Sequence, residues 1–365
     1  ARFDKLYKYY QKWSTQGGYL MDWKINGFTS VDKVGSATDG DIDVALALVL
    51  AHKQWGSAGT VNYKQESQNI LAKIYDQQTE SGLIKPGHHW NDRKNACYYT
   101  MASIGLFNQA QTTETYTTTR NWSNVYSTSY TFLETMQKNG LWPDWSENNG
   151  TIYSGGANFY WDACRTPWRI AWDYAWYGTA KGKTMLDKTI AFMSTKNVLS
   201  SPASAGAYSN LGGANYSAVT DQGEGKGNSC FMGGFASALM VDATKQSNLD
   251  TYYNSLKNLN ETYGYYAPTV QILYLLTLSG NTPNPYAITT TAPPTIASAT
   301  TNTTGNKITL AFSKTMASPA AGQTASFTLK VNGVTKTNAF TAIGLNALSS
   351  LSIDLTVSPS ITIAN

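Results

Sequence analysis

Two stretches of the sequence place acids beside residues with which they could do chemistry. Residues 158–178 read NFYWDACRTPWRIAWDYAWYG and hold four tryptophans, three tyrosines, two arginines and two aspartates. Residues 36–56 read SATDGDIDVALALVLAHKQWG, with three aspartates in the first eight positions. Flat aromatic faces suit the C–H faces of sugar rings, and paired carboxyl groups suit acid–base cleavage of a glycosidic bond. A bulky aromatic core is the alternative interpretation of the first stretch.

Asp162 and Arg165 are the most suggestive pair in the first stretch. They lie three residues apart, so in a helical segment they share a face, where Arg165 can orient Asp162 or hold it ionised. An ordinary structural ion pair is the alternative for Arg165. Farther along, Trp168, Trp172 and Trp176 recur every four residues and predict one buried helix stripe.

The aspartates of the second stretch have two interpretations. Asp39 could cap a helix, with Asp41 and Asp43 in the first turn, where the helix dipole favours acids. The exact string, however, resembles the signature of glycoside hydrolase family 8, in which an Ala-Thr/Ser-Asp-Gly/Ala-Asp opening precedes small and aliphatic residues and a closing aromatic. Val44 stands where that pattern usually has Ile or Met. The matching residues are Ala37, Thr38, Asp39, Gly40, Asp41, Ala45, Ala47, Leu48, Val49, Ala51 and Trp55.

Two further segments carry the same resemblance. WDACRTPWRIAWDYAWYG, residues 161–178, resembles the second landmark of the family, and YYAPTVQILYLLTLSGNTPNP, residues 265–285, resembles its C-terminal helix. The resemblance implies an all-α catalytic domain, an α/α toroid of six helical hairpins whose first hairpin is incomplete here. It also implies endo-acting, inverting hydrolysis of β-1,4-linked glycans, with cellulose or another β-glucan favoured and xylan or chitosan as alternatives within the family.

The resemblance also assigns roles to individual residues. It implies that Asp162 is the general base that deprotonates the attacking water, oriented by Arg165, and that Asp39 holds sugar hydroxyls at the cleavage site. Tyr98 matches a tyrosine near the water, with its neighbour Tyr99 as the alternative. For sugar contacts we expect the tryptophans of loop-like segments, although core packing is the alternative for each of them: Trp23, Trp90, Trp142, Trp145 and Trp161.

The general acid of the family has no counterpart here. It is a Glu in a Ser/Thr-Glu-Gly-x-Gly-Tyr-Gly motif upstream of the Asp39 region, whereas the 38 residues before Asp39 contain only Asp4, Asp22 and Asp32 as acids. Glu224 in GEGKGN resembles the motif superficially, but the residues after it match a later helix better. We therefore expect that the chain is incomplete at its N-terminus and that the general acid lies outside it. We accordingly expect little or no activity from the chain as given.

The remainder of residues 1–286 predicts helices that would position these side chains. Apolar residues recur at three- and four-residue spacing, loops rich in Gly, Asn and Trp separate them, and no β-hairpin signal or exact repeat appears. The pattern favours a helical toroid with loops gathered at one end. The predicted helical segments are 43–56, 63–78, 126–140, 183–196, 229–243 and 266–281.

Composition divides the chain. All 11 tryptophans lie at or before Trp176 and the last tyrosine is Tyr286. Residues 287–294 read as a Thr/Pro-rich linker. Residues 295–365 alternate apolar with small or polar residues between turn signals, which predicts a small β-sandwich of immunoglobulin-like type, cut short at SITIAN.

The remaining composition restricts partners and cofactors. The net charge of +4 comes from 27 basic and 23 acidic residues without charge runs, so neither nucleic acid nor a membrane surface is an expected partner. We expect a monomer that binds a β-1,4-linked polysaccharide, and the resemblance implies a secreted bacterial protein. A carbohydrate-binding protein without catalysis is the alternative of another class, and a serine hydrolase is disfavoured because no G-x-S-x-G segment occurs.

No metal or other cofactor is expected. His52, His88 and His89 are the only histidines, and they lack metal-ligand spacing. Cys97, Cys164 and Cys230 allow at most one disulfide, and the sequence leaves their pairing open.

Overall fold

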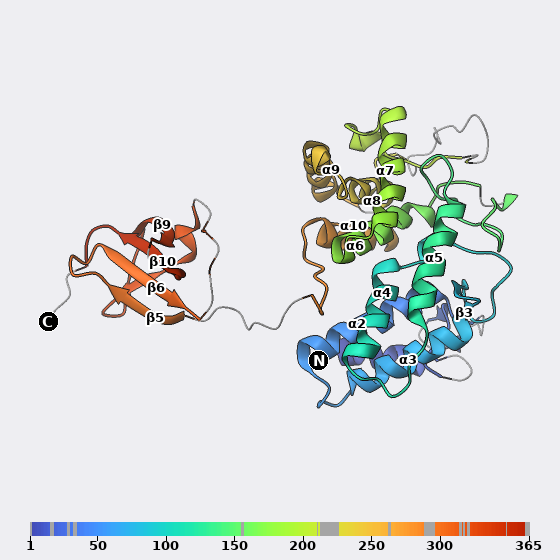
Figure 1. Ribbon diagram of the computed structural model, residues 1–365, viewed down its shortest axis with the longest axis horizontal. Coiled ribbons are helices and arrows are strands. Elements are labelled where there is room, and N and C mark those ends of the chain that lie inside the picture. Colours follow the sequence, from blue (N-terminus) through green and yellow to red (C-terminus); the bar gives the residue numbers. More distant parts are fainter. Residues whose placement is uncertain are drawn as a thin grey trace. The chain divides into compact units, whose positions relative to one another are not determined.

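The computed structural model describes residues 2–14, 18–27, 30–31, 35–154, 157–209, 211, 226–261, 264–287, 296–313, 316, 318–319, 322–347 and 349–361. Two compact units divide the chain, residues 1–287 and residues 288–365 (Figure 1). Most of the predicted linker 287–294 lies outside the described residues.

The described part of the first unit is a set of packed helix pairs. Successive helices pair as α2 with α3, α4 with α5, α6 with α7 and α8 with α9, while α2, α4, α6, α8 and α10 pack side by side in that order. This arrangement is the predicted α/α toroid. The helices are α1 (Arg2–Lys12), α2 (Thr38–Trp55), α3 (Tyr63–Gln78), α4 (Met101–Thr113), α5 (Trp122–Met136), α6 (Thr166–Tyr177), α7 (Ala180–Thr195), α8 (Ser229–Leu239), α9 (Gln246–Asn258) and α10 (Tyr266–Leu278).

Helix ends follow from local side chains. The Asn62 side chain accepts a hydrogen bond from the backbone N–H of Gln65 at the start of α3, and Asn121 and Asn228 cap α5 and α8 in the same way. Gly178 ends α6 in the left-handed region at φ 63°, which only glycine adopts without strain. These capping residues determine where the helices begin and end.

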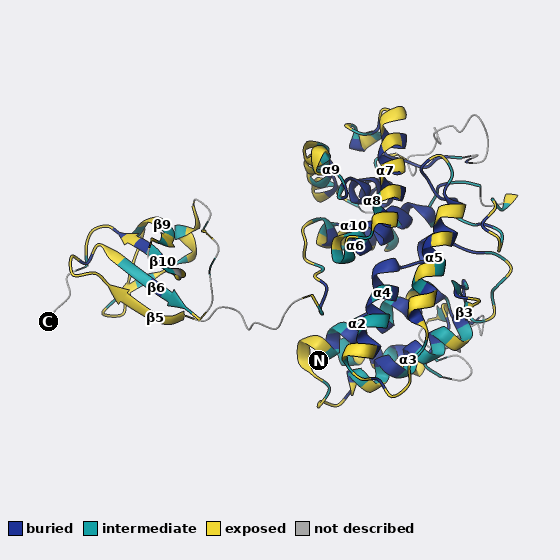
Figure 2. Cartoon of the chain, viewed as in Figure 1, coloured by how far each residue is buried: buried dark blue, intermediate teal, exposed yellow. Residues whose placement is uncertain are grey.

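All six predicted helical segments are helical, and α1, α4 and α9 were not predicted. Most of α4 is buried on every side, so its apolar residues form no single stripe for periodicity to detect. Figure 2 shows buried residues throughout α4 and α8, while α5 and α7 carry an exposed stripe toward solvent. The core therefore lies along the inner helices.

The expectation that residues 1–286 contain no β-hairpin is wrong at one position. Strands β3 (Thr79–Glu80) and β4 (Leu83–Ile84) pair antiparallel across Ser81 and Gly82, which have φ of 52° and 79°. Two left-handed residues in a two-residue turn are typical of a type I′ hairpin. Strands β1 (Ile25–Asn26) and β2 (Ser30–Val31) form a second short pair.

The second unit is all-β in its described residues apart from one 3₁₀ turn, Gln323–Ser326. Strands β5 (Ile296–Thr301), β6 (Lys307–Phe312), β10 (Ser349–Val357) and β9 (Phe340–Asn346) form one antiparallel sheet in that order. A separate hairpin joins β7 (Leu329–Val331) to β8 (Val334–Lys336). The small core of this second unit includes the buried side chains of Leu310, Ile353, Leu355 and Val357. The immunoglobulin-like assignment stays a prediction.

In the described part of the chain, none of the helices combines the length and apolar character needed to cross a bilayer.

Candidate active site

Asp39 and Asp162 lie on either side of one arginine. Arg165 donates from Nη1 to Asp39 Oδ2 at 3.2 Å and from Nη2 to Asp162 Oδ1 at 2.7 Å. The Arg165 side chain is 13% exposed, whereas Asp39 and Asp162 keep 22% and 33% of their side-chain surface. The fold thus brings Arg165 to Asp39, 126 positions earlier in the chain, and leaves both carboxylates accessible.

Local structure explains this placement. Asp162 immediately precedes a 3₁₀ turn, Ala163–Arg165, that runs into α6, with Pro167 favouring the helical start. The predicted i, i+3 ion pair is confirmed. Asp39 lies in the first turn of α2, but Ala37 occupies the N-cap position, so the interpretation of Asp39 as a cap is wrong. The N-terminal ends of α2 and α6 therefore bring the pair together.

The charge state of Asp162 is set by opposing influences. Burial raises its pKa above the usual aspartate value, and the negative charge of Asp39 raises it further. The Arg165 guanidinium and the Asn95 side chain oppose both effects by favouring the ionised form. A carboxylate that is partly desolvated yet held charged is suited to accept a proton.

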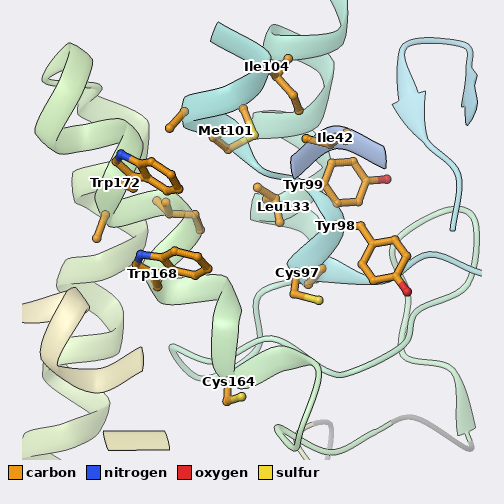
Figure 3. Packing of buried hydrophobic residues seen from close by; sticks show 14 of the residues in the cluster. Ile42, Cys97, Tyr98, Tyr99, Met101, Ile104, Leu133, Cys164, Trp168 and Trp172 are labelled. Atoms are coloured by element: carbon orange, nitrogen blue, oxygen red, sulfur yellow. The ribbon is translucent and has the colours of Figure 1, made fainter. Parts of the chain in front are cut away.

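Tyr98, rather than Tyr99, belongs to the site. Burial raises the Tyr98 pKa, and the next cause is the charge of Asp39, followed by Cys97 and Asp162, so the phenol lies close to both acids. Tyr99 is fully buried, and its hydroxyl donates to the Ile84 carbonyl at 3.3 Å. Figure 3 shows the two rings as separate members of the buried cluster. The alternative placing Tyr99 at the water is therefore disfavoured.

Four of the five predicted sugar-contacting tryptophans keep some exposed surface. Trp23 is 49% exposed and lies 6.2 Å from the ring of Trp90, which is half-buried. Trp145 lies 6.5 Å from the ring of Tyr98, next to the acids. Trp161, the residue before Asp162, lies 5.2 Å from the ring of Phe231. The assignment of these four indoles to sugar contacts stays a prediction.

The fifth, Trp142, does not belong to the site. Its side chain is fully buried and its indole N–H donates to the Leu133 carbonyl at 2.9 Å. The prediction that Trp142 contacts sugar is therefore wrong, because its indole packs into the core beside α5. The Trp168, Trp172 and Trp176 rings follow one another at 5.5 and 5.2 Å along α6, as predicted. Trp168 and Trp172 are buried (Figure 3), whereas Trp176 is only half-buried, so the predicted buried stripe is confirmed for the first two residues.

Sequence reasoning missed a third carboxyl group beside the pair. Asp144 Oδ1 accepts hydrogen bonds from the backbone N–H groups of Ala163 at 2.7 Å and Tyr160 at 3.1 Å, which flank Asp162. Burial, and then the charge of Asp162, raise its pKa to about 7. Asp144 stands alone in a PDW loop, so nothing in the sequence pattern pointed to this contact.

The histidines have structural partners. His88 Nδ1 lies 2.8 Å from Ser36 Oγ, and His52 Nε2 lies 3.1 Å from Glu114 Oε2. No cluster of three or more His, Cys, Asp or Glu side chains suited to a metal occurs among the described residues. Cys97, Cys164 and Cys230 are buried free thiols. Glu224, the alternative acid, lies outside the described residues.

Comparison with known sequences places this site in a family context. The family model described as "Glycosyl hydrolases family 8" matches residues 1–278. Endoglucanase 2 of Ruminiclostridium josui is 35% identical over 299 residues, which cover 78% of this chain and 60% of that protein. Endoglucanase A of Acetivibrio thermocellus is 34% identical over 299 residues, which cover 78% of this chain and 59% of that protein. The chain thus spans about three fifths of the length of these curated relatives.

Solved structures resemble the fold. A β-1,3-1,4-glucanase from Paenibacillus sp. X4 in its apo form superposes with a TM-score of 0.66 at 28% identity, covering 76% of each chain. A cold-adapted family 8 xylanase gives a TM-score of 0.60 at 22% identity, covering 77% of this chain and 75% of the other. At that identity the xylanase likeness concerns the fold alone.

Proposed function

The chain belongs to glycosyl hydrolase family 8, and on this premise we propose that it is the main part of an endo-acting, inverting β-glucanase in which Asp162 is the general base. The observation that carries the proposal is the double ion pair of Arg165 with Asp162 and Asp39, near the N-terminal ends of α2 and α6. A β-1,4-linked glucan is the proposed substrate, in keeping with the names of the curated relatives.

The proposed reaction is a single displacement. Asp162 removes a proton from water as the water oxygen attacks the anomeric carbon, and the bond to the leaving oxygen breaks on the opposite face. Arg165 keeps Asp162 ionised before the reaction and oriented during it. In this proposal Asp39, on the other arm of Arg165, accepts hydrogen bonds from sugar hydroxyls, and the Tyr98 hydroxyl holds the water.

We also propose that the general acid is supplied from outside this chain. The acid must carry a proton until the leaving oxygen departs. Asp39 and Asp162 are both engaged by the same guanidinium, which opposes protonation of Asp162 and leaves neither carboxylate free to serve the leaving oxygen. A glutamate on the far side of the sugar, roughly 6.5–9.5 Å from Asp162, would complete an inverting pair.

An activated substrate separates these two proposals. Dinitrophenolate leaves without protonation, so dinitrophenyl β-cellobioside needs the base but not the acid. We expect the chain to release dinitrophenolate from it while leaving barley β-glucan nearly intact. Release from neither substrate, together with tight binding of cello-oligosaccharides, would instead favour a non-catalytic carbohydrate-binding protein. Release from an aryl xylobioside alone would favour a xylanase.

Trp142 and Trp145 provide a matched test of the sugar contacts. Trp142→Ala opens a cavity in the core, and we expect it to lower the free energy of unfolding by about 3–5 kcal/mol. Trp145→Ala removes an accessible ring beside Tyr98, so we expect a small stability change and a loss of roughly 1–2 kcal/mol in cello-oligosaccharide binding. Denaturant unfolding measures the change in stability of each variant, and calorimetry measures the change in its affinity for cello-oligosaccharides. Unchanged affinity in Trp145→Ala would remove it from the proposed binding surface.

We further propose that the protein is secreted and works as a monomer. Its curated relatives come from bacteria and are named endoglucanases, and their polymeric substrates lie outside the cell.

A further inference from the structure

The loop that carries Asp144 is fixed at both ends. On one side, Trp142 is buried and bonded to the Leu133 carbonyl. On the other side, Ser146 and Lys94 exchange two backbone hydrogen bonds of 2.8 and 2.9 Å. Lys94 directly precedes Asn95, whose side chain faces Asp162. These contacts fix the loop, and with it the Asp144 carboxylate, beside the segment that carries Asp162.

From this position Asp144 reaches the backbone on both sides of Asp162. Its Oδ1 accepts from Tyr160 N–H and Ala163 N–H, and its own N–H donates to the Asn158 carbonyl at 2.8 Å. A carboxyl oxygen keeps this acceptor capacity whether or not the group is ionised. Asp144 is therefore one of the residues that tie the segment presenting Asp162 to its surroundings, together with Tyr266, whose hydroxyl donates to the Trp161 carbonyl at 2.6 Å.

We propose that Asp144 is a positioning residue for the candidate base: its carboxyl group fixes the backbone on either side of Asp162 and places a second acid behind it. The inference rests on the proposed function for its catalytic meaning, because only a base needs such precise placement.

The charges around the two acids make their coupling testable. Asp162 faces Arg165, Asp39 and Asp144, with the buried thiol of Cys97 and the phenol of Tyr98 nearby as neutral neighbours. Asp144 faces Asp162 as its principal charge, and this charge contributes to its raised pKa of about 7. Asp144 therefore titrates in the field of Asp162.

Backbone hydrogen exchange tests the positioning. In the chain as it exists, we expect Asp144→Ala to raise exchange over residues 159–165 by roughly tenfold, as the loss of two bonds to a buried acceptor implies. Asp144→Asn keeps an acceptor oxygen and should raise it less. Asp173→Ala is the matched control, since Asp173 is a buried carboxylate on α6 that binds Tyr126 and Tyr130 instead. Equal exchange in all four proteins would overturn the proposal.

Carboxyl titration supplies a readout that a purely structural role would not change. With ¹³C-labelled aspartate, we expect the pKa of Asp144 to fall in Asp162→Asn, because a like charge has been removed, and to stay near 7 in Asp173→Asn. An unchanged Asp144 titration in Asp162→Asn would contradict the coupling.

Stability against pH gives the third readout. A raised carboxyl pKa means that the folded state binds the proton more tightly, so stability from Asp144 is present at low pH and is lost as pH rises from about 4 to about 7. The Asp144→Asn variant has no carboxyl group at this position and does not lose stability in this way. We expect the melting temperature of the variant minus that of the parent to increase between pH 5 and pH 8. A melting-temperature difference that stays constant over this range would contradict the titration assigned to Asp144.

None of these measurements uses a substrate. If all succeed while no glycan is cleaved or bound, the proposed function fails and the structural link from Asp144 to Asp162 stands.

Discussion

We expect Asp162→Asn to lower the rate of dinitrophenyl β-cellobioside hydrolysis by about 10²–10⁴-fold, the typical contribution of a positioned acid or base. Asparagine has nearly the same shape but cannot take the proton of the attacking water. Arg165 keeps its bond to Asp39 in the variant, so the binding site should remain formed. Initial rates by dinitrophenolate absorbance give the kinetic effect, and calorimetry with cellotetraose should give an affinity within about threefold of the parent.

Asp173→Asn is the control for this prediction. It makes the same substitution at a buried aspartate of α6, whose partners are Tyr126, Tyr130 and Thr179 instead of Arg165. Its hydrolysis rate should stay near that of the parent. If Asp162→Asn also retains parental activity, the base is a different residue.

The second large effect concerns Arg165. Arg165→Leu leaves Asp39 and Asp162 facing each other without the shared cation. Breaking a buried pair by removing one partner costs about 3–5 kcal/mol, and we expect about 3 kcal/mol because Asp162 keeps 33% of its side-chain surface. Activity on the aryl cellobioside should be lost with it, since Asp162 is then neither oriented nor held ionised. Chemical denaturation measures the change in free energy of unfolding.

Two variants serve as controls for Arg165. Arg120 makes a similar two-pronged contact with Asp76 on an exposed surface, so Arg120→Leu should cost less than about 1 kcal/mol. Arg165→Lys keeps the charge but lacks the fork that binds two carboxylates, and should be intermediate. The Arg165→Leu deficit should shrink at acidic pH, because the raised pKa of Asp162 lets this carboxyl group take up a proton there. A deficit equal to that of Arg120→Leu would contradict the role given to Arg165.

The pair of acids and their arginine could be predicted because local sequence determines much of their geometry. Asp162 and Arg165 are three residues apart in a helical segment, which leads to the observed ion pair without long-range knowledge. Asp39 could be added from its motif. The contact of Asp39 with Arg165 joins distant segments, and it became visible only once α2 and α6 were packed near each other.

Asp144 and Trp142 lay beyond sequence reasoning for the same physical cause. Both occupy an irregular loop with no periodicity, where burial depends on which element covers the loop. Trp142 inserts beside α5, and Trp145, three residues later, stays accessible. Asp144 bonds to backbone N–H groups, which every residue but proline carries, so its partners leave no pattern in the sequence.

Helices with one solvent-exposed face could be predicted from the sequence. α3 and α7 alternate buried and exposed positions; the bounds of α3 were predicted to the residue and those of α7 to within three residues. α4 is covered on nearly all sides, and its sequence MASIGLFNQAQTT therefore lacks a distinct polar face. The β3–β4 hairpin carried a readable signal in Ser81-Gly82, which the sequence interpretation passed over.

The central claim is that Asp162 activates water for inversion. Proton NMR of dinitrophenyl β-cellobioside during hydrolysis by this chain tests it most directly, because the anomer released first reports the face of attack. We predict α-cellobiose first, with no such signal above the spontaneous rate in Asp162→Asn. β-Cellobiose released first, or α-cellobiose formed equally by Asp162→Asn, would contradict the assignment.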